Sequence, residues 1–76
     1  MNLSEQKREA TARLWAEDAY TAAIEYKRKI SMIHSLYGDH SEWRGPIRKA
    51  LTESQEAPMV AGELGLALGA ELEPVP

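Results

Sequence analysis

The densest group of side chains that could bind a metal ion lies between residues 34 and 42. It comprises two histidines and two carboxylates: His34, Asp39, His40 and Glu42. Imidazole nitrogens and carboxylate oxygens are ligands for divalent cations. These four residues nevertheless lack a recognised ligand spacing, and Gly38 separates the first histidine from the others. We therefore expect helix-face and turn residues here, with neither a metal site nor a cofactor site.

Nucleophilic catalysis would require an activated serine, threonine, cysteine or lysine within reach of a base. The chain has no cysteine, and its serines lie in helical or capping contexts without a strained turn around them. Ser31 and Ser35 lie one helical turn apart near His34, but neighbours in sequence point to different sides of a helix. A helical chain of 76 residues also has little material with which to enclose a substrate pocket. We expect no enzymatic activity.

Basic side chains form the remaining candidate site. They occur in two short groups: Lys27, Arg28, Lys29, Arg44, Arg48 and Lys49. Six positive charges at one end of the molecule would attract phosphate groups, and nearby tyrosines would stack on bases. However, acidic residues lie among them, the formal net charge is −3 and no groove-reading motif is present. Nucleic-acid or nucleotide binding is therefore the alternative hypothesis, and a surface for a protein partner is the principal one.

Charge is distributed unevenly along the chain. Residues 1–49 hold nine bases and seven acids, a net charge of +2, whereas residues 50–76 hold five acids and no base. Such an asymmetry is typical of a basic binding surface beside an acidic tail, but solvated charged faces in a short chain give the same pattern.

Composition favours a small soluble domain that needs additional stabilisation. A domain of this size buries only about 60% of the surface that its unfolded chain exposes. Because the chain has no cysteine, disulfides and cysteine-rich zinc sites are excluded, and oligomerisation becomes the leading means of stabilisation. Residues 1–13 lack the apolar core of an export signal, and residues 58–70 are too few to span a membrane. We expect a cytoplasmic protein that does not bind membranes.

Residues 4–37 predict one long helix, because they contain no glycine or proline and are rich in good helix formers. Ser4 is the expected N-cap and Gly38 the expected C-cap. Two apolar rows follow helical spacing. The first row, interrupted by Lys29, contains Ala12, Trp15, Ala19, Ala22, Tyr26, Ile33 and Leu36. The second row, interrupted by Lys27, contains Ala16, Tyr20, Ala23, Ile30, His34 and Tyr37.

These rows form a broad stripe whose small residues would let another helix approach closely. A helix of this length measures roughly 50 Å, whereas a compact globule of this chain would be about 30 Å across. The helix therefore either bends back or belongs to an elongated molecule whose stripe is covered by a second copy, and the second interpretation is simpler. The residues expected to mediate self-association are Trp15, Ala19, Ala22, Tyr26 and Ile33.

Two shorter helices are predicted after the turn. Pro46 suits the first position of a helix over 46–55, in which Ile47, Ala50 and Leu51, together with Trp43 before it, should pack against the long helix. Pro58 opens a further helix over 58–72, in which Val60 and Leu64 share a face. Three glycines weaken that helix, so it should form only when packed.

The sequence thus predicts an all-α fold: a small helical bundle built on one long N-terminal helix with two shorter helices, completed by dimerisation. Residues 1–72 should form a single domain and residues 73–76 a disordered tail. The principal functional hypothesis is a non-enzymatic homodimer that binds and modulates, or inhibits, a protein partner. A purely structural assembly subunit is a third possibility.

Overall fold

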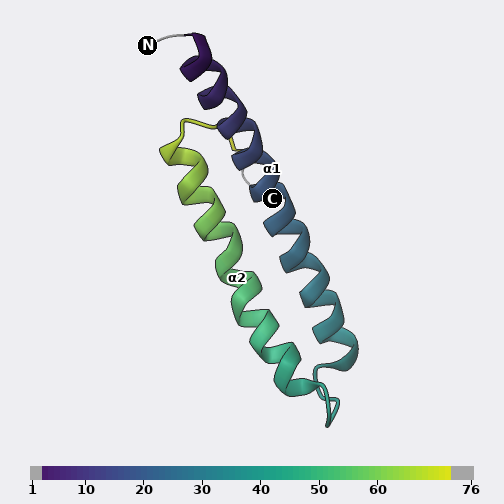
Figure 1. Cartoon of the computed structure of the whole chain (residues 1–76). Coiled ribbons are helices and arrows are strands. Elements are labelled where there is room, and N and C mark those ends of the chain that lie inside the picture. Colours follow the sequence, from purple (N-terminus) through teal and green to yellow (C-terminus); the bar gives the residue numbers. More distant parts are fainter. Residues whose placement is uncertain (1–2, 73–76) are drawn as a thin grey trace.

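The computed structural model describes residues 3–72, which form two helices. Helix α1 spans Leu3–Tyr37 and helix α2 spans Arg44–Ala67. The helices lie side by side and antiparallel, joined by a short loop at one end (Figure 1). The hairpin measures 57 × 23 × 14 Å, and its radius of gyration is 16.2 Å, against about 11 Å for a compact domain of this length. The predicted all-α class and the elongated shape are confirmed, while the tail predicted at 73–76 lies outside the described residues.

Helix α1 has almost the predicted bounds. It ends at Tyr37, directly before Gly38, as expected. A Cβ atom on Gly38 would lie 2.6 Å from the carbonyl oxygen of His34, so only glycine fits there without a shift of the backbone. The helix begins at Leu3, one residue earlier than predicted. Ser4 therefore lies within the helix, and its predicted role as N-cap is wrong.

Helix α2 replaces the two shorter helices predicted at 46–55 and 58–72, and that part of the prediction is wrong. The helix runs without a break through Pro58, which has no N–H to donate to the carbonyl of Ser54. Pro46 lies in the first turn, where a missing N–H costs nothing because no helical carbonyl precedes it. Ser54 and Ala61, on either side of Pro58 in sequence, are buried and half-buried, and tertiary packing of this kind overrides local helix propensity.

The contact between the helices, here called the seam, follows a heptad spacing on both of them. The seam positions of α1 follow the second predicted row as far as His34 and include Lys27, which interrupts that row: Ala16, Tyr20, Ala23, Lys27, Ile30 and His34. Lys27 and His34 are exposed, and the other four are buried or half-buried. The seam residues of α2 are all buried or half-buried: Ile47, Leu51, Ser54, Pro58, Ala61 and Gly65. The predicted packing of Ile47 against the long helix is thus confirmed, and Ala50 and Leu51 are half-buried.

The core along this seam is thin. Within residues 4–72, for which side-chain exposure is described, the buried residues are Ala16, Ile47, Ser54, Gly65 and Ala70. Ser54 is 0% exposed, and its hydroxyl donates to the carbonyl of Leu51 over 2.9 Å. Ile47 is the one large apolar side chain among the buried residues. Small residues bring the helices close together, but they remove little apolar surface from water.

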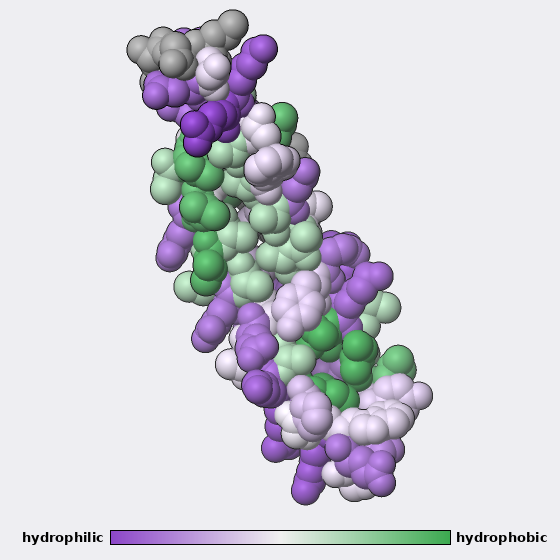
Figure 2. All heavy atoms as spheres, in the orientation of Figure 1, coloured by the Kyte–Doolittle hydropathy of each residue, from purple (hydrophilic) through white to green (hydrophobic). Residues whose placement is uncertain are grey.

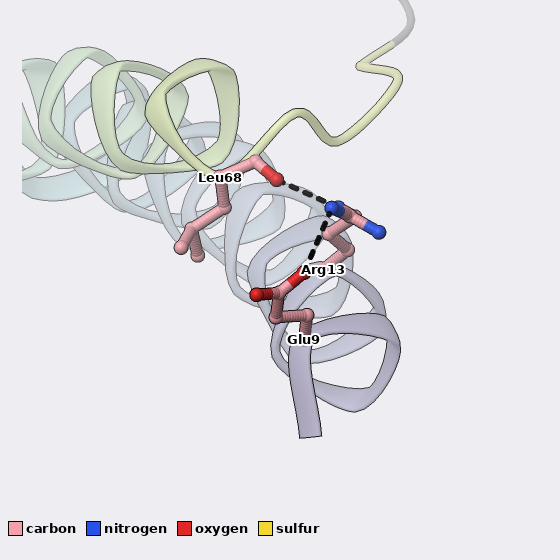
Figure 3. Close-up of polar contacts among 3 residues, drawn as sticks. All are labelled: Glu9, Arg13 and Leu68. Carbon is pink, nitrogen blue, oxygen red and sulfur yellow. Dashed lines mark hydrogen bonds and ion pairs between the residues drawn. The ribbon is translucent and has the colours of Figure 1, made fainter. Parts of the chain in front are cut away.

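The open end of the hairpin is fastened by the residues that follow α2. Gly69 has a φ of +80°, and the N–H of Ala70 donates to the carbonyl of Gly65 over 2.9 Å, which is the geometry of a Schellman C-cap. The chain then turns back so that Leu72 packs on Gly65. Arg13 reaches across from α1 and donates from Nε to the carbonyl of Leu68 over 2.7 Å (Figure 3).

Candidate interaction face

The first predicted row of α1 is not covered by α2. From Trp15 to Ile33, each of its members directly precedes a seam residue and is therefore rotated about 100° from the seam. Lys29, which interrupts the row, has the same relation to Ile30, and Leu36 continues the spacing. These residues form the α1 outer row: Trp15, Ala19, Ala22, Tyr26, Lys29, Ile33 and Leu36. All of them are exposed, and Trp15, with 70% of its surface accessible, is among the most exposed apolar residues.

Helix α2 carries an equivalent row. Each of its members from Pro46 to Leu64 directly precedes a seam residue, and Ala67 continues the heptad spacing three residues after Leu64. These residues form the α2 outer row: Pro46, Ala50, Glu53, Ala57, Val60, Leu64 and Ala67. Val60 and Leu64 are 65% and 55% exposed. They share a face as predicted, but that face is turned away from α1, because Pro58, Ala61 and Gly65 occupy the seam instead.

The two outer rows lie on the same side of the hairpin. In an antiparallel pair of right-handed helices, residues rotated from the seam in the same sense lie on the same face. We call this surface the apolar face. Figure 2 shows one face of the hairpin on which hydrophobic residues gather along the C-terminal half of α2 and between the helices, with a second group nearer the loop.

The opposite side is more polar. Residues that directly follow seam residues lie there, and most of them have charged, hydroxyl or amide side chains: Glu17, Thr21, Arg28, Ser31 and Ser35 on α1, with Arg48, Thr52 and Gln55 on α2. A shallow groove beside Tyr20, Met59 and Leu66 interrupts this polar surface. The hairpin therefore has two unlike faces, and the apolar face carries the larger set of uncovered apolar residues.

The five residues predicted to mediate self-association, Trp15, Ala19, Ala22, Tyr26 and Ile33, all lie on the apolar face and are exposed. The structure adds Val60 and Leu64 of α2 to this surface, although the sequence alone did not predict that they share a face with the α1 outer row. The heptad spacing from Ile47 to Gly65 continues across Pro58 and would have revealed that connection.

The six predicted basic residues, Lys27, Arg28, Lys29, Arg44, Arg48 and Lys49, are all exposed and lie in the half of the hairpin nearer the loop. This half, residues 25–56, also contains five acidic residues and is therefore nearly neutral. Arg28 forms an ion pair with Glu25 over 3.4 Å. The acidic segment after residue 50 lies alongside α1, so the charge asymmetry seen along the sequence does not separate into two ends in space.

Among the four residues first considered for metal binding, His40 has its side chain engaged within the loop. The imidazole of His40 stacks on the indole of Trp43, with ring centroids 4.0 Å apart, and its Nδ1 accepts from the backbone N–H of Glu42 over 3.2 Å. Tyr37 packs edge-on against Trp43 at 5.2 Å. Over residues 3–72 no group of three or more histidine, aspartate or glutamate side chains is placed to hold a metal ion.

Two hydroxyl groups on the polar side of the hairpin are engaged with the helix backbone. Ser35 donates to the carbonyl of Ser31 over 3.1 Å, and Thr52 donates to the carbonyl of Arg48 over 3.2 Å. Such bonds are ordinary for hydroxyl residues within helices. Neither α1 nor α2 combines the length and apolarity needed to cross a membrane.

No protein-family model matches the chain, and no curated protein or solved structure is similar to it at a significant level. The features that bear on function are therefore physical ones: an apolar face that α2 leaves uncovered, and exposed basic residues near the loop.

Proposed function

We propose that this chain is a non-enzymatic helical module that binds a protein partner and modulates its activity, and that it acts as a homodimer. One observation carries the proposal. Large apolar side chains, led by Trp15, Val60 and Leu64, remain more than half exposed on one face of a hairpin whose own core is thin. Exposed apolar surface that spans two helices is characteristic of a protein-interaction site.

The proposed function uses two separate surfaces of the hairpin, one for self-association and one for the partner. Self-association through the apolar face would cover the outer rows and leave the loop end and the polar side accessible. Arg44, Arg48 and Lys49 then form the surface offered to the partner, because all three are exposed near the loop. Arginine is favoured at protein interfaces because its planar guanidinium makes several directed hydrogen bonds.

Two neighbouring positions provide a matched test of the apolar face. Leu14 and Trp15 are 60% and 70% exposed, but only Trp15 lies in an outer row. We expect Trp15→Ala to raise the dimer dissociation constant at least tenfold, because tryptophan is enriched among the residues that dominate interface energy and Trp15 is the largest side chain in either outer row. Leu14→Ala should leave it unchanged. Light scattering across a dilution series measures both. A Trp15→Ala variant that dimerises as well as Leu14→Ala would contradict the proposal.

The partner-binding surface needs a separate experiment. We would compare proteins crosslinked in cells to the wild type with those crosslinked to a triple alanine variant at Arg44, Arg48 and Lys49. The proposal expects one protein to be lost from the variant while dimerisation persists. If the variant retains every protein captured by the wild type, the assigned surface is wrong.

The competing functions give distinct results in the same preparations. Nucleic-acid binding would weaken by orders of magnitude between low and moderate salt, because bound cations are released from phosphates. A protein interface that is largely apolar would respond little. A structural assembly subunit would form rings or filaments in place of a closed dimer.

A further inference from the structure

We propose that the apolar face is covered by a second copy of the chain, related by a two-fold axis parallel to the long axis of the hairpin. The product is a four-helix bundle with both connecting loops at the same end. This inference rests on the homodimer proposed above and specifies its interface and orientation.

The size and shape of the apolar face favour a second hairpin as the occupant. The two longer dimensions of the hairpin, 57 × 23 Å, outline a face of about 1,300 Å². This area exceeds the roughly 800 Å² that each partner buries in a standard stable interface. A single helix would cover one outer row and leave much of the other outer row exposed. A second copy has the required width and is present whenever the chain itself is made.

The contacts between the helices fix which outer-row residues lie at the same height. A Cβ atom on Gly62 would lie 3.4 Å from the ring of Tyr20, so these two positions face each other. Because both helices rise by the same amount per residue, two steps along α1 correspond to two steps back along α2. Ala22 therefore lies at the height of Val60.

A two-fold axis parallel to the hairpin places each α1 outer row opposite the partner's α2 outer row at equal height. The resulting apolar pairs combine a larger with a smaller side chain at every level: Trp15 with Ala67, Ala19 with Leu64, Ala22 with Val60, Tyr26 with Ala57, Ile33 with Ala50, and Leu36 with Pro46. Alternation of large and small residues is what lets two layers interdigitate at native packing density. The apolar face is thus complementary to itself.

The charged residues of the outer rows are also complementary across the proposed interface. Lys29 is the one base in the α1 outer row and Glu53 the one acid in the α2 outer row, and both lie at the same height. In the proposed dimer each Lys29 lies opposite the partner's Glu53. Two such pairs, related by symmetry, would fix the register of the helices.

The reversed orientation is less favourable. A two-fold axis perpendicular to the hairpin would set each row against itself in the opposite direction. Trp15 would then meet Leu36, two large residues, while Ala57 would meet its own symmetry mate, two small ones. Glu53 would lie opposite Val60 with no base to pair with it.

Mixing two charge-reversed variants tests the pairing. Lys29→Glu alone and Glu53→Lys alone each place like charges across the interface, and we expect each to raise the dimer dissociation constant at least tenfold. An equimolar mixture should restore dimers of wild-type affinity, because every charge in the heterodimer is again opposite its complement. A pair formed only within one hairpin would not be restored by mixing. Failure of the mixture to recover would overturn the proposed pairing.

A distance measurement tests the orientation without disturbing the interface. The chain has no cysteine, so Ser41→Cys introduces a single site for a spin label in the loop. Loops at the same end predict a distance between labels within about 30 Å, a few interhelix spacings. Loops at opposite ends predict a distance close to the 57 Å length of the hairpin.

The outcomes separate this inference from the proposed function. A dimer whose labels lie far apart overturns the parallel two-fold axis and leaves the homodimer intact. A chain that stays monomeric at every concentration overturns both. A dimer with close labels and recovery on mixing supports the proposed bundle.

Discussion

Glycine occupies positions with opposite physical demands in this chain. Gly69 adopts a φ of +80°, a conformation that L-residues rarely adopt, and it allows the C-cap that turns Leu72 back onto Gly65. Gly45 lies in the first turn of α2, and a Cβ atom there would meet nothing within 4 Å. The first glycine is required by the backbone, whereas the second only adds flexibility to the unfolded chain.

This contrast predicts stability changes of opposite sign. Gly69→Ala should lower the free energy of unfolding by about 1–2 kcal/mol, the cost of a left-handed alanine. Gly45→Ala should raise it by about 0.5 kcal/mol through its better helix propensity. Urea unfolding followed by circular dichroism, at one fixed protein concentration, measures both. Equal effects of the two substitutions would contradict the assigned role of Gly69.

At the scale of elements, Pro58 is the unusual feature, because an interior proline normally ends or kinks a helix. It leaves the carbonyl of Ser54 without its helical donor, within the seam. Pro46 differs because it lies in the first turn, where no such bond is lost. The same residue type therefore has unequal costs at two positions of one helix.

Replacing each proline by alanine measures that difference. An interior proline is about 3 kcal/mol less favourable than alanine, but the half-buried Pro58 ring also contributes packing. We expect Pro58→Ala to raise the free energy of unfolding by about 1–2 kcal/mol, and Pro46→Ala to leave it within about 0.5 kcal/mol. Chemical denaturation at matched concentration tests both. A loss of stability in Pro58→Ala would show that the ring packing outweighs the lost hydrogen bond.

The sequence predicts the bounds of α1 but not those of α2. The bounds of α1 were predictable because no glycine or proline interrupts 4–37 and Gly38 ends it. Local signals do not predict α2 as one helix, because Pro58 is typical of a helix start, although the heptad spacing from Ile47 to Gly65 continues through it. Local propensity decided that prediction wrongly, and tertiary packing decided the structure.

The sequence predicts the residues that α1 contributes to the apolar face, but it does not predict those of α2. The two rows of α1 are visible in the sequence, but nothing in α1 alone says which row α2 covers. Only the antiparallel pairing identifies the row of Ala16 as the seam and the row of Trp15 as the uncovered surface. The contribution of Val60 and Leu64 to the same face follows from that pairing as well.

For the whole molecule, we expect folding and dimerisation to be thermodynamically coupled. The hairpin buries few large side chains among the described residues, whereas helices in proteins derive most of their stability from tertiary packing. Ordering the chain costs on the order of 1–2 kcal/mol of backbone entropy per residue, which a thin seam does little to offset. Covering the apolar face would supply much of the missing burial, so unfolding and dissociation should occur together.

That coupling predicts a melting temperature that depends on protein concentration. Mass action stabilises a dimer as concentration rises, and typical unfolding entropies for two such chains give a rise in Tm of roughly 5–10 °C over a hundredfold increase. Circular dichroism melts across that range provide the measurement, with Trp15→Ala expected to lower Tm throughout and Leu14→Ala to follow the wild type. A Tm that does not change with concentration would mean that the hairpin is stable alone, and that the apolar face is kept for a different protein.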